Sequence, residues 1–154
     1  MKKISRILYY AAALISPVIF AGLLINHEQR ILLFIYVILT TLLFLFYART
    51  YESNGKDQDF DSLPNGKEET IIFYTGGLFQ LFAIAQPFTV LISLRHKFAG
   101  HQRGFVPPDI SVEHLGKALF WTIVFFMIGR TLVAIFEVLK HLQRNPPPIS
   151  KDCS

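Results

Sequence analysis

The chain has 154 residues, a hydrophobic content of 52%, a mean hydropathy of +0.41 and a formal net charge of +4. This composition is too apolar for an ordinary soluble domain, and the length is too short for several domains. We therefore expect one small integral membrane protein, in contact with the lipid bilayer and without a role in nucleic-acid binding.

Four apolar segments approach the roughly 20 residues that an α-helix needs to cross about 30 Å of hydrocarbon. They are residues 7–25, 31–48, 71–94 and 118–139. The second segment has no charge and is apolar on every side, which is atypical of a helix in a small soluble domain. Because helices satisfy their own backbone groups in lipid, the sequence predicts an all-α fold, a membrane four-helix bundle of antiparallel transmembrane helices within residues 1–142. The proline-rich residues 143–154 predict a disordered tail.

The distribution of Lys and Arg favours an orientation with both termini in the cytoplasm, since cytoplasmic loops are enriched in these residues. The cytoplasmic side would hold Lys2, Lys3, Arg6, Arg49, Lys56, Lys67, Lys140, Arg144 and Lys151. The opposite side would hold Arg30, Arg95, Lys97, Arg103 and Lys117.

A basic connection, "RHKFAGHQRGFVPP", follows the third segment and contributes Arg95, His96, Lys97, His101 and Arg103. We expect a loop that anchors to anionic headgroups if it is cytoplasmic, or that binds a partner if it is external. No histidine lies within a span, and no cysteine or paired carboxylate completes a ligand spacing. The sequence therefore predicts neither a metal site nor another cofactor. After the connection, Asp109 or Ser111 is expected to cap the next helix.

Arg130 lies near the middle of the fourth segment, where a charge is costly and should face the bundle interior and find a partner. If the third and fourth helices pack as an antiparallel pair, Gln80 lies at nearly the same depth as Arg130. Gln86 then lies about one turn closer to the connection, and Glu137 lies about two turns beyond Arg130 on the same helix face. We predict an intramembrane polar cluster of these residues. It either fixes the helix pair or forms a site that binds an anionic ligand or gates a pathway.

Glycines and aromatic residues predict how the helices pack. Gly76, Gly77 and Gly129 permit close approach between helices, and Pro17 and Pro87 are expected to kink theirs. Several aromatic residues are expected to contact lipid or form belts at the membrane surface. These residues are Tyr9, Tyr10, Tyr47, Tyr51 and Trp121.

The order of residues in the connection also carries a family resemblance. A basic helix end, a glycine–aromatic turn and a glycine that opens the next span follow one another at Arg95, Arg103, Gly104, Phe105, Leu115 and Gly116. Over residues 94–121 this order resembles an uncharacterised bacterial group of small multi-span membrane proteins, domain of unknown function 2975. The resemblance implies the cell inner membrane and a regulatory or sensory accessory role. It also implies a cytoplasmic basic loop, which opposes the charge count and leaves the orientation of that loop open.

Catalysis is not expected, because the sequence offers no nucleophile with a base and no metal-ligand set. The remaining interpretation is an accessory or regulatory protein that acts through helix contacts with another membrane protein or through self-association. The alternative is a small transporter or channel subunit that uses the polar residues around Arg130.

Overall fold

The computed structural model describes residues 2–26, 30–52, 66–101 and 111–144, and only the backbone of residues 2, 22–26, 91, 94–101 and 144. It contains four long helices: α1 Lys2–Asn26, α2 Arg30–Thr50, α3 Lys67–His101 and α4 Val112–Arg144. The described ranges contain no strand, so the all-α prediction is confirmed. Each helix holds one predicted apolar segment and is long and apolar enough to span a membrane.

The helices of the second half are longer than their apolar segments predict. α3 has 35 residues and α4 has 33, against 25 for α1 and 21 for α2. At 1.5 Å per residue, α3 and α4 are about 50 Å long, and α1 and α2 about 30 to 40 Å. The prediction of a loop from residue 95 onward was wrong for residues 95–101, where the backbone continues α3. Likewise, residues 143 and 144 belong to α4 and not to a tail.

The helices are longer than the apolar segments because an apolar segment marks only the residues that lipid can cover. A helix continues as long as its backbone hydrogen bonds continue. Arg and Lys are good helix formers, so a basic stretch does not end a helix. The tail residues 145–154 lie outside the described residues.

Local sequence sets the starts of α3 and α4. The Oγ of Ser111 accepts a hydrogen bond from the backbone N–H of His114 at 3.3 Å, which is the N-cap geometry and confirms one of the two predicted caps. At the start of α3, Glu68 and Glu69 occupy the first turn, where negative charge is favourable for the helix dipole.

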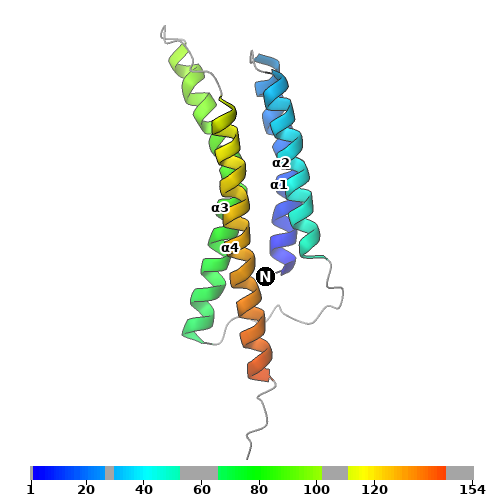
Figure 1. Cartoon of the computed structure of the whole chain (residues 1–154), viewed down its shortest axis with the longest axis vertical. Helices are drawn as coiled ribbons and strands as arrows, with labels where there is room; N and C mark the ends of the chain where they lie inside the picture. The colour runs from blue at the N-terminus through cyan, green and yellow to red at the C-terminus, as the bar shows by residue number, and fades with distance from the viewer. Residues whose placement is uncertain (1, 27–29, 53–65, 102–110, 145–154) are drawn as a thin grey trace, which may run out of the picture.

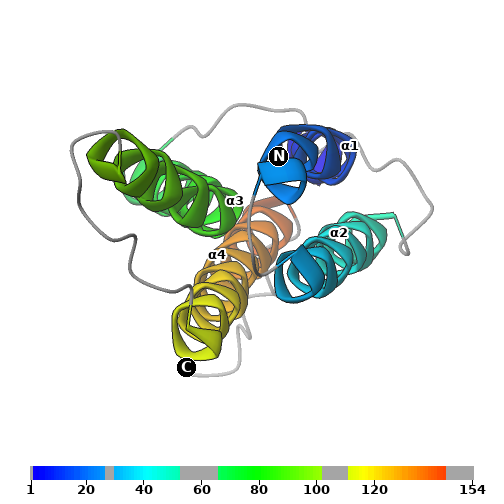
Figure 2. The same ribbon diagram turned by 90° about the horizontal axis from the view of Figure 1, so that it is seen from above.

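The helices form two pairs, with α1 beside α2 and α3 beside α4 (Figures 1 and 2). Contacts between the pairs are sparser and join α1 to α3 and α2 to α4. Figure 1 shows that α1 and α2 run alongside the upper part of α3 and α4, which continue below the N-terminus. We call this continuation, residues 67–72 of α3 and 137–144 of α4, the extension.

An aromatic cluster joins the two pairs. Phe126 of α4 stacks on Tyr47 of α2, with ring centroids 3.6 Å apart and an interplanar angle of 2°. Tyr9 of α1 packs edge-on against both rings, at 5.5 Å from Tyr47 and 5.7 Å from Phe126. Tyr51 stacks on Tyr9 at 6.1 Å. Such ring pairs are favourable beyond the area that they bury, so this cluster contributes to holding the two pairs together.

The belt prediction was therefore wrong for Tyr9, Tyr47 and Tyr51, which are buried. These tyrosines fill the space between helices because a large planar ring bridges helices that do not approach closely. Trp121 is exposed, as predicted, and Tyr10 is partly buried. A second cluster lies nearer the opposite end of the bundle, around Phe20 and Tyr36.

Candidate functional site

α3 and α4 approach most tightly at Gly129. A Cβ added there would lie 3.0 Å from Cγ of Gln80 and 3.2 Å from the backbone oxygen of Gly76. These distances are tighter than an ordinary van der Waals contact, so a side chain at residue 129 would have to displace Gln80 or the backbone of α3. Gly76 and Gly129 therefore lie at a close approach of the two helices, as predicted. The glycine contact places Gln80 next to the residue that precedes Arg130.

Gln80 and Arg130 meet at Tyr51, which follows the last residue of α2. The side-chain amide of Gln80 donates a hydrogen bond to the Tyr51 hydroxyl. The guanidinium carbon of Arg130 lies 4.8 Å from the centroid of the Tyr51 ring, which is cation–π geometry. Tyr51 is only 6% exposed. We call Gln80, Tyr51 and Arg130 the Tyr51 cluster, and it joins α2, α3 and α4 at one level.

Two polar atoms of this cluster are buried without a hydrogen-bond partner among the described residues: Oε1 of Gln80 and Nη1 of Arg130. A buried polar group left unpaired costs about 1–3 kcal/mol, so the cluster is not the least costly way to join three helices. Oε1 of Gln80 can therefore accept a hydrogen bond from a further polar group, and Nη1 of Arg130 can donate one.

The electrostatics of the cluster centre on the Tyr51 hydroxyl. Burial raises the pKa of Tyr51, the hydrogen bond from Gln80 and the charge of Arg130 lower it, and the charge of Glu137 raises it. The net direction is upward, so the hydroxyl stays protonated at neutral pH. The cluster therefore carries the charge of Arg130 without a tyrosinate to balance it.

Glu137 is partly buried two turns beyond Arg130 and acts on Tyr51 through its charge. Gln86, by contrast, lies six residues beyond Gln80 along α3, and its backbone oxygen accepts a hydrogen bond from Thr89 at 2.6 Å. The contacts described for the Tyr51 cluster do not include Gln86. Of the four residues predicted as a polar cluster, the structure thus brings Gln80 and Arg130 together and leaves Glu137 nearby.

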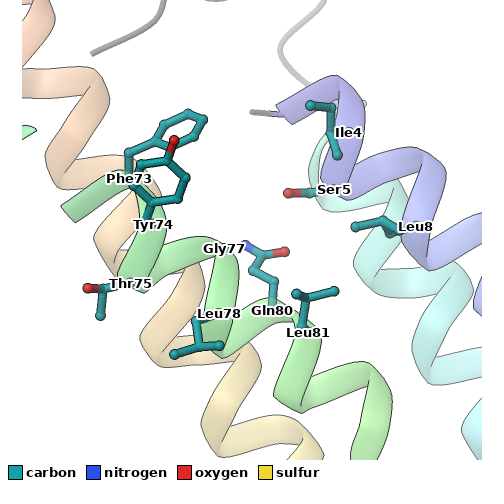
Figure 3. A pocket seen from close by; sticks show the side chains of 10 residues that line it. All are labelled: Ile4, Ser5, Leu8, Phe73, Tyr74, Thr75, Gly77, Leu78, Gln80 and Leu81. Atoms are coloured by element: carbon teal, nitrogen blue, oxygen red, sulfur yellow. The ribbon is translucent and has the colours of Figure 1, made fainter. Parts of the chain in front are cut away.

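A cavity of about 510 Å³ adjoins Gln80, between the start of α1 and the first half of α3 (Figure 3). Its walls are apolar apart from a few side chains, among them Gln80, Ser5 and Thr75. The Tyr51 cluster therefore stands beside a space that could admit a ligand.

The predicted basic loop is only partly described. Arg95, His96, Lys97 and His101 belong to the last turns of α3, where the backbone alone is described, and Arg103 lies outside the described residues. Their binding role stays a prediction. Among the described residues, no group of three His, Cys, Asp or Glu side chains could hold a metal ion.

Sequence reasoning missed Tyr51 as a member of the site. A signal was present, because Tyr36, Thr40, Phe44, Tyr47 and Tyr51 recur every three or four residues and so share one face of α2. A stripe of aromatic and hydroxyl-bearing residues along one face of an apolar helix indicates an interior face.

No family model, curated protein or solved structure matches the chain. The likeness to the bacterial group over residues 94–121 stays a prediction, and the functional argument rests on the geometry of the chain itself.

Proposed function

We propose that this chain is a multi-pass membrane protein with four antiparallel transmembrane helices and both termini in the cytoplasm. The pairing of residues supports the antiparallel arrangement. Tyr9 contacts Tyr47 while Phe20 contacts Tyr36, so residue numbers rise along α1 as they fall along α2. The same inverse order holds for α3 and α4, where Gly129 meets Gln80 and Phe136 meets Phe73.

Membrane insertion is supported by the outward surface of the helices. Large apolar side chains are exposed along all four of them, including Leu14, Leu42, Leu81 and Phe120. A soluble protein rarely exposes a continuous apolar surface of this extent, whereas lipid covers it without cost.

The function that the geometry supports best is that of an accessory or regulatory protein of the inner membrane that binds another membrane protein through helix contacts. The extension is the observation that carries this proposal. α2 ends at the level of Tyr51 and Arg130, and α1 begins about two turns before Tyr9, which stacks on Tyr51. A bilayer that covers α1 and α2 therefore leaves the end of the extension beyond its cytoplasmic surface. Val138 and Leu142 on the extension are 58% and 51% exposed.

Apolar side chains outside the bilayer need a protein surface to cover them. The two helices of the extension pack on each other, since Phe73 contacts Phe136 at its base at 5.4 Å and, one turn further, Glu69 and Lys140 are both buried. A rigid helix pair with an uncovered apolar face is suited to helix-in-groove or helix-on-helix recognition.

Site-specific photo-crosslinking in cells tests this proposal. A photoreactive residue at Val138 should give a discrete adduct with one membrane protein, and Leu142→Glu should abolish that adduct. Phe120, which is 59% exposed on the same helix, serves as a matched control and should give lipid adducts. If Val138 and Phe120 give the same products, the extension does not bind a partner.

A small transporter or channel subunit is the second candidate, favoured by the unpaired Gln80 Oε1 and Arg130 Nη1. The Tyr51 cluster lies near the middle of the candidate spans of α3 and α4 but at the end of α2, so a pathway through it would leave the α1–α2 pair at that level. Substrate-dependent flux into liposomes that contain this chain alone, lost in Arg130→Leu with the fold retained, would favour the transporter over the accessory protein.

A further inference from the structure

The cavity between α1 and α3 opens on the outer surface of the bundle. Ile4 and Tyr74, which line it, are 60% and 65% exposed and form its mouth. Leu8, Leu78 and Leu81 supply an apolar wall, and Leu78 and Leu81 are about half exposed. A volume of about 510 Å³ lies within the range of about 300–1,000 Å³ that is typical of small-molecule sites.

One wall of the cavity carries an unpaired acceptor. Gln80 is 1% exposed, its amide nitrogen is used by Tyr51, and its Oε1 has no partner among the described residues. Figure 3 shows the amide oxygen in the gap between α3 and α1, on the side of Ser5 and Leu8. Because an amide oxygen only accepts hydrogen bonds, a molecule that satisfies it must bring an N–H or O–H group.

We propose that this cavity binds a membrane phospholipid whose headgroup carries an N–H or O–H donor. An acyl chain lies along Leu8 and Leu81, on the bilayer side of the cavity, and the headgroup donor binds Oε1 of Gln80 beside Leu78. The depth of the site supports a lipid, since Gln80 lies at the level where α2 ends and where headgroups would stand. This inference rests on the membrane insertion proposed above.

Two lipids of equal charge that differ in headgroup N–H donors test whether such a donor is needed for binding. Phosphatidylethanolamine has three N–H donors in its headgroup, whereas phosphatidylcholine with the same acyl chains has none. Native mass spectrometry of the purified full-length chain should show about a fivefold preference for phosphatidylethanolamine in the first lipid adduct, the value of one net hydrogen bond. Gln80→Met should remove the preference. Gln86→Met, on the same helix but outside the cavity lining, should keep it.

A second variant tests the cavity without touching a buried residue. Leu78→Trp fills the space from a position that is 49% exposed and should lower the first adduct of both lipids at least fivefold. Ile92→Trp, at a similarly exposed position on α3 that does not line the cavity, should leave it unchanged.

Equal binding of the two lipids, or equal adducts for Leu78→Trp and Ile92→Trp, would overturn the site. The proposal of membrane insertion fails by a different result. A chain that stays in the soluble fraction after cell lysis contradicts membrane insertion itself. A chain found in the membrane that binds both lipids equally contradicts only the lipid site.

Discussion

The two helix pairs are packed through different kinds of side chains. In the α1–α2 pair, tyrosine and phenylalanine rings fill the interface, and Ser16 and Thr41 contribute one hydroxyl contact at 3.3 Å. In the α3–α4 pair, Gly129 allows close approach and polar side chains are buried beside it. α1 and α2 match the thickness of a bilayer, and α3 and α4 exceed it. The pair that exceeds the bilayer is also the pair that contributes Gln80 and Arg130 to the Tyr51 cluster, so we place the functional surface there.

The largest expected effect concerns the joint between the pairs. Phe126→Ala removes the ring that stacks on Tyr47 and contacts Tyr9 edge-on, and it leaves a cavity that rigid helices cannot close. We expect a loss of about 3 kcal/mol in the free energy of unfolding, measured by thermal or denaturant unfolding in detergent. Phe120→Ala, at an exposed position six residues earlier, should change stability by less than about 0.5 kcal/mol. Equal losses would mean that the aromatic cluster does not join the pairs.

A smaller effect is expected within the α3–α4 pair. Gly129→Leu forces a side chain into atoms of Gln80 and Gly76 and should cost about 1–3 kcal/mol. Gly116→Leu is the matched control on the same helix, because a Cβ at Gly116 meets nothing within 4 Å. The same unfolding assay compares the two. A Gly116 variant as unstable as the Gly129 variant would show that glycine is needed for reasons other than close approach.

The Tyr51 cluster is expected to contribute less again. In a double-mutant cycle, Arg130→Met and Tyr51→Leu should show a coupling energy of about 1 kcal/mol, since the guanidinium lies over the ring. Arg49, an exposed cation two residues from Tyr51, gives the control cycle, and its coupling should be near zero. If both cycles give the same coupling energy, the contact between Arg130 and Tyr51 does not itself stabilise the protein.

The smallest expected effect is at the start of α4. Ser111→Ala removes the oxygen that accepts from the N–H of His114 and should lower stability by about 0.5 kcal/mol. Ser93→Ala, at an exposed position on α3, is the control and should be neutral. Unfolding midpoints of the two variants measure the difference, and a shift of the same size in both would argue against a capping role.

The sequence predicted the helices well because a continuous apolar run has few other structures available to it. It also predicted that Gln80 lies at the level of Arg130. In two antiparallel helices that follow each other in the chain, residues at equal distances from the connection lie side by side. The end of α3 and the role of Tyr51 could not be predicted in the same way. The end of a helix beyond its apolar segment depends on backbone hydrogen bonds. Whether a tyrosine contacts lipid or protein depends on packing, which hydropathy does not report.

The central claim is that the chain crosses the bilayer four times, with the extension on the cytoplasmic side. Single cysteines in a Cys153→Ser background test it with a maleimide that does not cross membranes. The exposed residues His141 and Glu113 should label from opposite sides, His141→Cys only in inverted vesicles and Glu113→Cys only in intact cells. Leu42→Cys, on the outward face of α2, should not label from either side. Labelling of His141→Cys and Glu113→Cys from the same side, or rapid labelling of Leu42→Cys, would contradict this account.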